Sequence, residues 1–377
     1  LTSALKSIER ELVKDGSFKP DDSYEDVHTQ IQDVVARKVG KLALKLHTAR
    51  SRNDQVVFAV KMYCKDKIVG LRSDIAAFEK TISGLIAKNK GMVIPGFTHM
   101  QHAQPIYLKD YLDAYAAMLK RDAERLGNIG AGIKPTLGAG AMAGTPISAS
   151  KYGAFVVSNS IDTVSDRDFV IEILSALAIV GMHLSRLAED LIIWSTKEFD
   201  FIELDEAFCT GSSLMPHKKN PDALELVRGY AGRLYGNLVS VLTTMKGLPL
   251  SYNRDMQLDK EPLFSSVEIV SDELKVLAGL VATLRFNKDK IEEALEDESL
   301  YATDLVYYLV DKGVAFKDSH DIVGRLVRYS LDNDIEIKSM TEHELHRFSD
   351  KFVGKEIIKL FNPKVSVESK KSCRRPI

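Results

Sequence analysis

The hydrophobic residues recur with a helical period along almost the whole chain. In one run, successive apolar positions are three or four residues apart, at an average step of about 3.5 residues, as in the seam of a coiled coil. The positions are Val57, Val60, Cys64, Ile68, Leu71, Ile75, Phe78, Ile82 and Leu85. The pattern predicts a helix of more than roughly 30 residues, far beyond the average of about 11–12, with Asn53 or Asp54 as its N-cap.

Four more segments show the same kind of pattern and predict further long helices. They run from about 106 to 127, 166 to 195, 221 to 245 and 262 to 284. The second of these is apolar on nearly all sides between its charged ends, which is typical of a helix that is buried all round. No stretch alternates with a period of two for long enough to indicate a sheet. Five long helices predict an all-α bundle, and their large apolar surface predicts that bundles from several chains pack together.

The periodic segments become shorter towards both ends of the chain. After about residue 290 the predicted helices are short, which favours a small separate C-terminal domain. Residues 1–50 also contain short helical patterns and are expected to form part of a small N-terminal domain. We therefore predict three domains, at 1–50, 51–290 and 291–377.

Composition and charge exclude several classes of protein. With 377 residues, of which 45% are hydrophobic and 28% charged, the chain is globular and not disordered. A net charge of −2 gives no reason to expect nucleic acid or a membrane surface as a partner. The most apolar stretch, 173–185, is too short for a membrane span of about 20 residues. Cys64, Cys209 and Cys373 are odd in number and far apart, so we expect no disulfide framework and a cytoplasmic location.

Two polar segments precede predicted helices. Residues 47–55 read HTARSRNDQ and place Arg50 and Arg52 before the longest helix. Arginine binds carboxylates through two parallel hydrogen bonds, and a helix N-terminus adds N–H donors, although a solvated helix start is an equal alternative. Residues 96–105 read GFTHMQHAQP, a concentration of hydrogen-bonding groups. Its two histidines are three residues apart, but no HExxH pattern or cysteine accompanies them, so we expect no metal.

Two more polar segments interrupt the bundle later in the chain. Residues 210–222 read TGSSLMPHKKNPD, in which Asn220 and Pro221 predict a helix start. That helix end and Lys218 would together bind an anion and favour the alkoxide form of a serine, whereas a plain Gly-Ser loop with a basic flank is the alternative. Residues 251–261 read SYNRDMQLDKE and offer a phenol, an amide, carboxylates and Lys260; a charged interhelix loop is equally compatible.

Other known motifs are missing or incomplete. The glycine of the third segment is not followed by GK[ST], and no GxSxG motif occurs, so phosphate-loop and hydrolase-elbow chemistry are disfavoured. Residues 138–144 are rich in glycine but lack the GxGxxG spacing and follow no predicted strand, so they are a weak dinucleotide signal.

The four polar segments together resemble the argininosuccinate lyase family, in the same order and with similar spacing. HTARSRNDQV, GFTHMQHAQP, GSSLMPHKKNPDALEL and YNRDMQLDKEP carry the resemblance, and residues 164–172 and 302–327 extend it. GSSxMPxK alone is less specific, because fumarases and aspartases carry similar loops. HTARSRNDQ together with KKNPDxLEL and YNRDMQLDK narrows the resemblance to argininosuccinate lyase.

The resemblance implies an all-α, three-domain fold of the fumarase/aspartase type. Its central five-helix bundle would form a twenty-helix core in a homotetramer, with each active site shared between three subunits. The implied reaction is the reversible β-elimination of argininosuccinate to arginine and fumarate, through an aci-carboxylate carbanion that cations and N–H dipoles would stabilise. No metal, organic cofactor, nucleic acid or membrane is implied.

The resemblance also assigns roles to individual residues. Ser212 matches the base, Lys218 would stabilise the carbanion or activate Ser212, and His99 supported by Glu225 matches the proton donor. Asn220 would bind a substrate carboxylate. The other matched substrate-binding positions are Asp26, His28, Ser51, Arg52, Asn53, Thr98, Tyr252, Gln257 and Lys260.

The chain departs from the family pattern at two internal positions and at both ends. Ala49 stands where glycine is common and His217 replaces a usual glutamine, with little expected effect. No WGGRF-like motif occurs near Leu1, and residues 372–377 stand where the family has a GGT-containing stretch. The resemblance therefore implies a chain truncated at its N-terminus and also at its C-terminus.

Three alternatives remain open at this point. Another fumarate-releasing lyase of the superfamily is disfavoured by the RSRND and KKNPD stretches. A non-catalytic, crystallin-like protein is disfavoured by the presence of all five matched chemical residues. An inert fragment that does not assemble is the third, and the choice between arginine biosynthesis and the urea cycle also stays open.

Overall fold

The computed structural model describes residues 1–14, 19 and 21–372. In this part of the chain it contains fourteen α-helices and three antiparallel strand pairs, which confirms the predicted all-α class. The helices are α1 (Thr2–Lys14), α2 (Val27–Val39), α3 (Arg52–Lys88), α4 (Leu108–Gly132), α5 (Ser160–Ser165), α6 (Asp168–Trp194), α7 (Asp222–Met245), α8 (Lys260–Thr283), α9 (Lys288–Leu295), α10 (Ala302–Asp311), α11 (Phe316–Asn333), α12 (Glu342–His346), α13 (Gly354–Leu360) and α14 (Pro363–Ser369). The strands are β1 (Val93–Thr98), β2 (Gln101–Tyr107), β3 (Ile202–Glu203), β4 (Thr210–Gly211), β5 (Lys219–Asn220) and β6 (Arg285–Phe286).

The chain divides into two compact units that alternate along the sequence. Unit 1 comprises residues 1–68, 129–172 and 240–261, and unit 2 comprises residues 69–128, 173–239 and 262–377. Helices α3, α4, α6, α7 and α8 each contribute residues to both units. The predicted three-domain boundaries stay a prediction.

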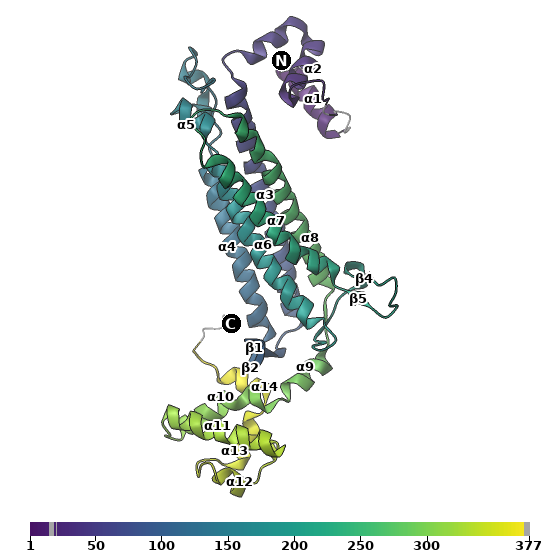
Figure 1. The fold of residues 1–377 in the computed structure, drawn as a ribbon, viewed down its shortest axis with the longest axis vertical. Helices are drawn as coiled ribbons and strands as arrows, with labels where there is room; N and C mark the ends of the chain where they lie inside the picture. Colours follow the sequence, from purple (N-terminus) through teal and green to yellow (C-terminus); the bar gives the residue numbers. More distant parts are fainter. Residues whose placement is uncertain (15–18, 20, 373–377) are drawn as a thin grey trace. The chain divides into compact units, whose positions relative to one another are not determined.

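The five long helices predicted from the hydrophobic pattern are α3, α4, α6, α7 and α8 (Figure 1). All nine apolar positions of the predicted seam on α3 are buried, with at most 6% of each side chain exposed. In unit 2 these helices are joined by side-chain contacts. The Asp74 carboxylate of α3 accepts a hydrogen bond from Ser271 of α8 at 2.7 Å, and Asn237 of α7 donates to Ser266 of α8 at 2.9 Å.

Helix α6 is buried nearly all round, as its composition predicts. None of its residues from 173 to 185 is exposed. By length and composition alone α6 would be able to cross a membrane, but 61% of its most apolar window is buried inside the protein. Because a buried window of this kind is also typical of a core helix, the apolar character of α6 follows from its place in the bundle.

The core of the bundle contains a paired charge. Asp122 of α4 is fully buried and bonds His183 Nδ1 of α6 at 2.7 Å and Arg125 at 2.6 Å. A buried carboxylate without a partner would be strongly destabilising, so this network links α4 to α6.

Two smaller hydrophobic clusters lie at the ends of the chain. Leu305, Leu309, Leu326 and Phe352 belong to a core shared by the helices that follow α9. A second cluster contains Ile8 of α1 and Val35 of α2 together with their neighbours. Short helices are marginal alone, so this burial is what holds both groups of helices together.

Candidate active site

Ser51 and Asp54 cap the N-terminus of α3. The Ser51 Oγ accepts a hydrogen bond from the Asn53 N–H at 3.3 Å, and the Asp54 carboxylate accepts one from the Ser51 N–H at 3.0 Å. The two bonds together cap the start of the helix. The predicted cap, Asn53 or Asp54, is therefore wrong: the helix begins at Arg52, and Ser51 takes the N-cap position because Asp54 can reach back to it.

Asp54 also binds the glycine-rich segment 138–144. Its side chain is fully buried, and its second carboxylate oxygen accepts hydrogen bonds from the Gly138 N–H at 3.3 Å and the Gly140 N–H at 3.0 Å. Gly140 has a φ of +58°, and a Cβ there would lie 2.8 Å from the Gly144 carbonyl oxygen. The glycines are needed for this close turn, and their N–H groups hold a carboxylate of the protein.

A charged cluster joins the start of α2 to the start of α3. Asp26 caps α2 by accepting the Thr29 N–H at 2.8 Å, and its other oxygen pairs with Arg52 Nε at 2.7 Å. Arg52 also donates to the Thr29 hydroxyl at 3.0 Å and to the Gln55 side chain at 2.7 Å. Gln55 in turn bonds His28 Nδ1 at 3.1 Å. The structure thus brings the predicted residues Asp26, His28 and Arg52 together.

The electrostatics of this cluster favour a charged acid and a neutral imidazole. Burial alone would raise the pKa of Asp26, but hydrogen bonds from Thr29 and the charge of Arg52 outweigh it, so the pKa lies below its usual range. Burial and the nearby Arg52 charge lower the pKa of His28. At neutral pH the cluster therefore presents an ionised carboxylate, a guanidinium and an uncharged imidazole.

The segment 251–261 contributes a second group of predicted residues to unit 1. Tyr252 and Lys260 are half-buried and Gln257 is exposed. Lys260 Nζ lies 2.8 Å from a carboxylate oxygen of Asp259. Asp259 is itself buried and pairs with the buried Arg167 at 2.5 Å. This buried pair fixes the start of α8 and hence the position of Lys260.

His99 lies at the tip of a β-hairpin in unit 2, in a turn of two residues. Thr98 pairs with Gln101, so the strands β1 and β2 are joined by His99 and Met100 alone. Both residues have positive φ, at 54° and 61°, as a type I′ turn requires. The sequence did not predict this hairpin, because a proline interrupts each strand and a glycine also interrupts β1.

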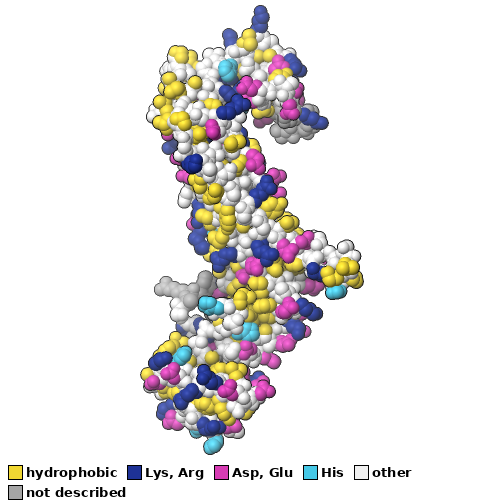
Figure 2. Space-filling model, viewed as in Figure 1, with side chains coloured by type: hydrophobic (Ala, Val, Ile, Leu, Met, Phe, Trp, Pro, Cys, Tyr) yellow, Lys and Arg dark blue, Asp and Glu magenta, His cyan; other side chains and the backbone are white. Residues whose placement is uncertain are grey.

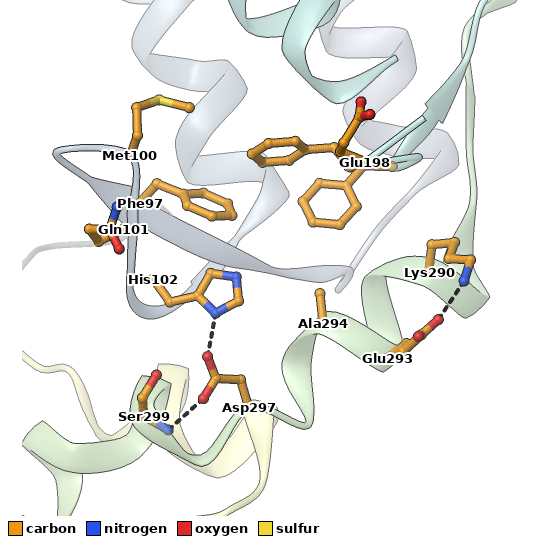
Figure 3. Close-up of a pocket in the computed structure, with 12 residues that line it drawn as sticks. Phe97, Met100, Gln101, His102, Glu198, Lys290, Glu293, Ala294, Asp297 and Ser299 are labelled. Carbon is orange, nitrogen blue, oxygen red and sulfur yellow. Dashed lines mark hydrogen bonds and ion pairs between the residues drawn. The ribbon is translucent and has the colours of Figure 1, made fainter. Parts of the chain in front are cut away.

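The turn end of the hairpin, with Phe97, Met100, Gln101 and His102, lines a pocket of about 730 Å³ (Figure 3). His102 Nδ1 lies 2.5 Å from the Asp297 carboxylate, and Asp297 also accepts the Ser299 N–H at 2.9 Å. Phe97 packs against the His102 ring with their centroids 5.1 Å apart. Burial would raise the pKa of Asp297, but the hydrogen bonds from His102 and Ser299 keep it below its usual range. The His102–Asp297 pair thus ties the hairpin to the segment before α10, which sequence reasoning missed.

Ser212 lies on the loop between β4 and β5, which projects from the helices of unit 2 (Figure 1). Its Oγ accepts hydrogen bonds from the N–H groups of Leu214 at 3.2 Å and Met215 at 3.0 Å. Lys218 is exposed on the same loop, and 84% of Leu214 is exposed. Hydrophobic side chains gather at the tip of this projection (Figure 2).

The loop leads directly into α7. The Asn220 amide donates to the Gly211 carbonyl at 3.5 Å and so closes the β4–β5 pair. The Pro221 carbonyl accepts the Glu225 N–H at 3.1 Å, so α7 begins at Asp222, one residue later than its predicted start. Glu225 lies exposed in the first turn of α7.

The predicted site residues fall into both units. Eight belong to unit 1: Asp26, His28, Ser51, Arg52, Asn53, Tyr252, Gln257 and Lys260. Six belong to unit 2: Thr98, His99, Ser212, Lys218, Asn220 and Glu225. The support of His99 by Glu225 stays a prediction. Within residues 1–14, 19 and 21–372, no group of three or more His, Cys, Asp or Glu side chains is placed to hold a metal ion.

Comparisons with known proteins identify the family. A family model described as Lyase matches residues 2–236, and one described as Argininosuccinate lyase C-terminal matches residues 299–368. The argininosuccinate lyase of Caldicellulosiruptor saccharolyticus is 45% identical over 368 residues, which are 95% of this chain and 79% of that protein. That of Syntrophobacter fumaroxidans is 48% identical over 357 residues, which are 92% of this chain and 76% of that protein. The chain belongs to the argininosuccinate lyase family. Membership in this family places it among the lyases.

Solved structures agree with the fold of the family. A crystal structure of EDDS lyase in complex with formate has a TM-score of 0.84 and 28% sequence identity, and the match covers 98% of this chain and 75% of that one. A class II fumarase from Schistosoma mansoni has a TM-score of 0.76 at 17% identity, covering 90% of this chain and 78% of that one. The predicted fumarase/aspartase-like fold is confirmed.

Proposed function

We propose that the protein catalyses the reversible β-elimination of argininosuccinate to L-arginine and fumarate. The observation that carries the proposal is the identity of 45–48% with argininosuccinate lyases over more than nine tenths of the chain. The four polar segments on which the resemblance rests all lie within this match. The expected cytoplasmic location stays a prediction.

In the proposed reaction, Ser212 removes the proton from the carbon next to a substrate carboxylate. The electron pair of the broken C–H bond moves into that carboxylate and makes it doubly charged. Two N–H groups already point at Ser212 Oγ. Because such donors interact more strongly with an oxyanion than with a hydroxyl, they favour the alkoxide that a serine base needs. Lys218, on the same loop, adds a positive charge.

The charge on the aci-carboxylate also needs stabilisation. Asn220, next to the first turn of α7, is assigned to a substrate carboxylate, where the helix N-terminus adds its partial positive charge. In unit 1, Ser51, Arg52 and Asn53 at the start of α3 are assigned to a further part of the substrate, because they combine a guanidinium fork with helix N–H donors.

The second half of the reaction expels the guanidinium nitrogen. The carbanion electron pair forms the double bond of fumarate while the carbon–nitrogen bond breaks, and the leaving nitrogen receives a proton. His99, at the exposed tip of the hairpin, is assigned this donation, with Glu225 as its support. Asp26, His28, Thr98, Tyr252, Gln257 and Lys260 complete the proposed substrate contacts.

We further propose that the active form is a homotetramer whose active sites are shared between three subunits. The proposed residues come from two compact units of one chain and from segments that are far apart in the sequence. One substrate has to touch all of these groups. Residues supplied by neighbouring chains would meet this requirement.

The direct test is to follow fumarate absorbance when the purified protein is mixed with argininosuccinate. We expect turnover in the wild type, a loss of most turnover in Ser212→Ala with substrate binding retained, and little change in Ser213→Ala, which alters an exposed hydroxyl of the same loop. Release of fumarate from adenylosuccinate or aspartate, and not from argininosuccinate, would support another lyase of the superfamily. Full turnover in Ser212→Ala would refute the base assignment.

A further inference from the structure

The hairpin that carries His99 borders the pocket of about 730 Å³ with its turn end (Figure 3). His99 and Met100 form the turn, and 57% of Met100 is exposed. A segment that faces a hollow or solvent lacks the packed neighbours that normally fix its position, so it moves more easily than a buried segment. The position of His99 therefore depends on contacts made farther down the strands, beside the pocket.

One such contact is the pair of His102 and Asp297, whose side chains point toward one another (Figure 3). His102 Nδ1 lies 2.5 Å from one oxygen of the Asp297 carboxylate. The other oxygen accepts the Ser299 N–H at 2.9 Å and so caps the short 3₁₀ helix Glu298–Tyr301, which fixes the carboxylate on its own segment. Because the Nδ1 N–H can donate from a neutral or a charged imidazole, the tie does not require His102 to be protonated.

Phe97 holds the His102 ring from a second side. The two residues pair across β1 and β2, and their ring centroids are 5.1 Å apart. Phe97 also packs against Phe199 and Phe201, with centroids 5.5 and 6.4 Å away. An aromatic ring and a carboxylate together define where the His102 ring lies. Only one residue pair separates His102 from the two-residue turn, so a shift of His102 moves the tip of the hairpin and His99 with it.

We propose that His102 and Asp297 are positioning residues that hold His99 where it gives its proton to the leaving nitrogen. This inference rests on the proposed function, because it needs His99 as the proton donor. Proton transfer requires heavy atoms about 2.6–3.2 Å apart, and a displacement of about 1 Å can slow a reaction about 100-fold. Without the pair, the turn end of the hairpin is free to shift, and the pocket beside it has room for a displacement of that size.

The proposal makes the two proton transfers of the reaction respond differently. Ser212 lies on a separate loop and breaks the C–H bond, so loss of the pair leaves this step unchanged and slows the cleavage of the C–N bond. A carbanion that does not eliminate takes a proton back and becomes argininosuccinate again. In D2O the proton held by Ser212 exchanges with solvent, so a deuteron is returned. The argininosuccinate that remains then carries a C–D bond in place of the C–H bond.

The experiment uses the full chain in D2O and measures two quantities, fumarate release by absorbance and deuterium in the remaining argininosuccinate by mass spectrometry. His102→Phe keeps a ring against Phe97 but loses the Nδ1 donor, and Asp297→Ala removes the acceptor. His102→Asn is the conservative variant, because its amide N–H can stand where the Nδ1 N–H stood. His343→Phe is the matched control, since it makes the same substitution at an exposed histidine of α12. Thermal unfolding verifies that each variant folds.

We expect the ratio of deuterium incorporation to fumarate release to rise about 100-fold in His102→Phe and in Asp297→Ala. The ratio should return towards the wild-type value in His102→Asn and stay unchanged in His343→Phe. A fall of both rates with an unchanged ratio would overturn the proposal, because it would indicate general damage, and so would a wild-type ratio in Asp297→Ala. In both cases an active wild type leaves the proposed function standing. A wild type that neither releases fumarate nor incorporates deuterium would overturn the proposed function and this proposal with it.

Discussion

Replacing Asp54 by alanine tests whether this buried carboxylate holds the turn that carries the proposed substrate-binding residues. One carboxylate oxygen accepts the N–H of Ser51 at 3.0 Å, and the other accepts the N–H groups of Gly138 and Gly140 at 3.3 and 3.0 Å. Alanine removes both oxygens and leaves these donors without a partner. Asparagine keeps one oxygen, so its amide nitrogen has to face either the serine or the glycines.

The magnitude follows from the two buried glycine donors. A buried N–H left without a partner costs about 1–3 kcal/mol, so Asp54→Ala should cost about 2–6 kcal/mol in this region. That is a large part of the about 5–15 kcal/mol by which proteins are stable. Asp54→Asn should lie between alanine and the wild type. Asp66→Asn on the exposed face of α3 should stay within about 0.5 kcal/mol.

Hydrogen exchange measured by mass spectrometry detects the loss of stability in the glycine turn itself, because it is followed peptide by peptide. If opening of the glycine turn governs exchange, the peptide that covers residues 137–145 should exchange about 30-fold to 10⁴-fold faster in Asp54→Ala. The KM for argininosuccinate should rise as well, because the start of α3 loses its anchor. Exchange of this peptide equal to that in Asp66→Asn would refute the reasoning.

The structure predicts the outcome of three further experiments. Gly96→Ala places a Cβ 2.7 Å from a main-chain oxygen of the opposite strand, so the variant should show reduced turnover in the fumarate assay. Gly70→Ala, with open space around the new Cβ, should keep the wild-type turnover. Equal rates for the two variants would contradict this prediction. Arg167→Met removes the buried partner of Asp259 and leaves it paired only with the half-buried Lys260. The variant should cost up to about 3–5 kcal/mol, seen as a lower midpoint of thermal unfolding, and an unchanged midpoint would be inconsistent with the pair. Burial raises the pKa of Cys64 to about 12, so a disulfide reagent at pH 8 should label this thiol only after unfolding; labelling in the native protein would contradict its burial.

The long helices were predictable because their pattern depends on local spacing. A step of three or four residues puts apolar side chains on one face, and the run from Val57 to Leu85 is buried as that rule requires. The hairpin was not predictable in this way. Pro95 pairs with Pro105, and the register shifts by one residue near Gly96, so neither strand shows a clean alternation.

Contacts between segments that are distant in the sequence explain the other differences between the prediction and the structure. The sequence places Asp54 near a helix start, but its bonds to Gly138 and Gly140 join residues more than 80 positions apart. The pattern of these glycines indicates at most a weak dinucleotide signal. Glu273 resembles any other charged residue of α8, and only its place on the buried face, beside Leu277, makes it unusual. Sequence patterns give the elements, whereas packing decides which polar groups are buried.

The tip of the hairpin is a strained turn that exposes His99. Type I′ turns favour Asn-Gly, because both central residues need positive φ, and a non-glycine residue in this region costs about 1–3 kcal/mol. Here the two positions are His99 and Met100, and both side chains are exposed. The pair of His102 with Asp297 holds the hairpin in place below the strained turn. His99 is exposed at this tip, as the proposed donation of a proton to a substrate requires.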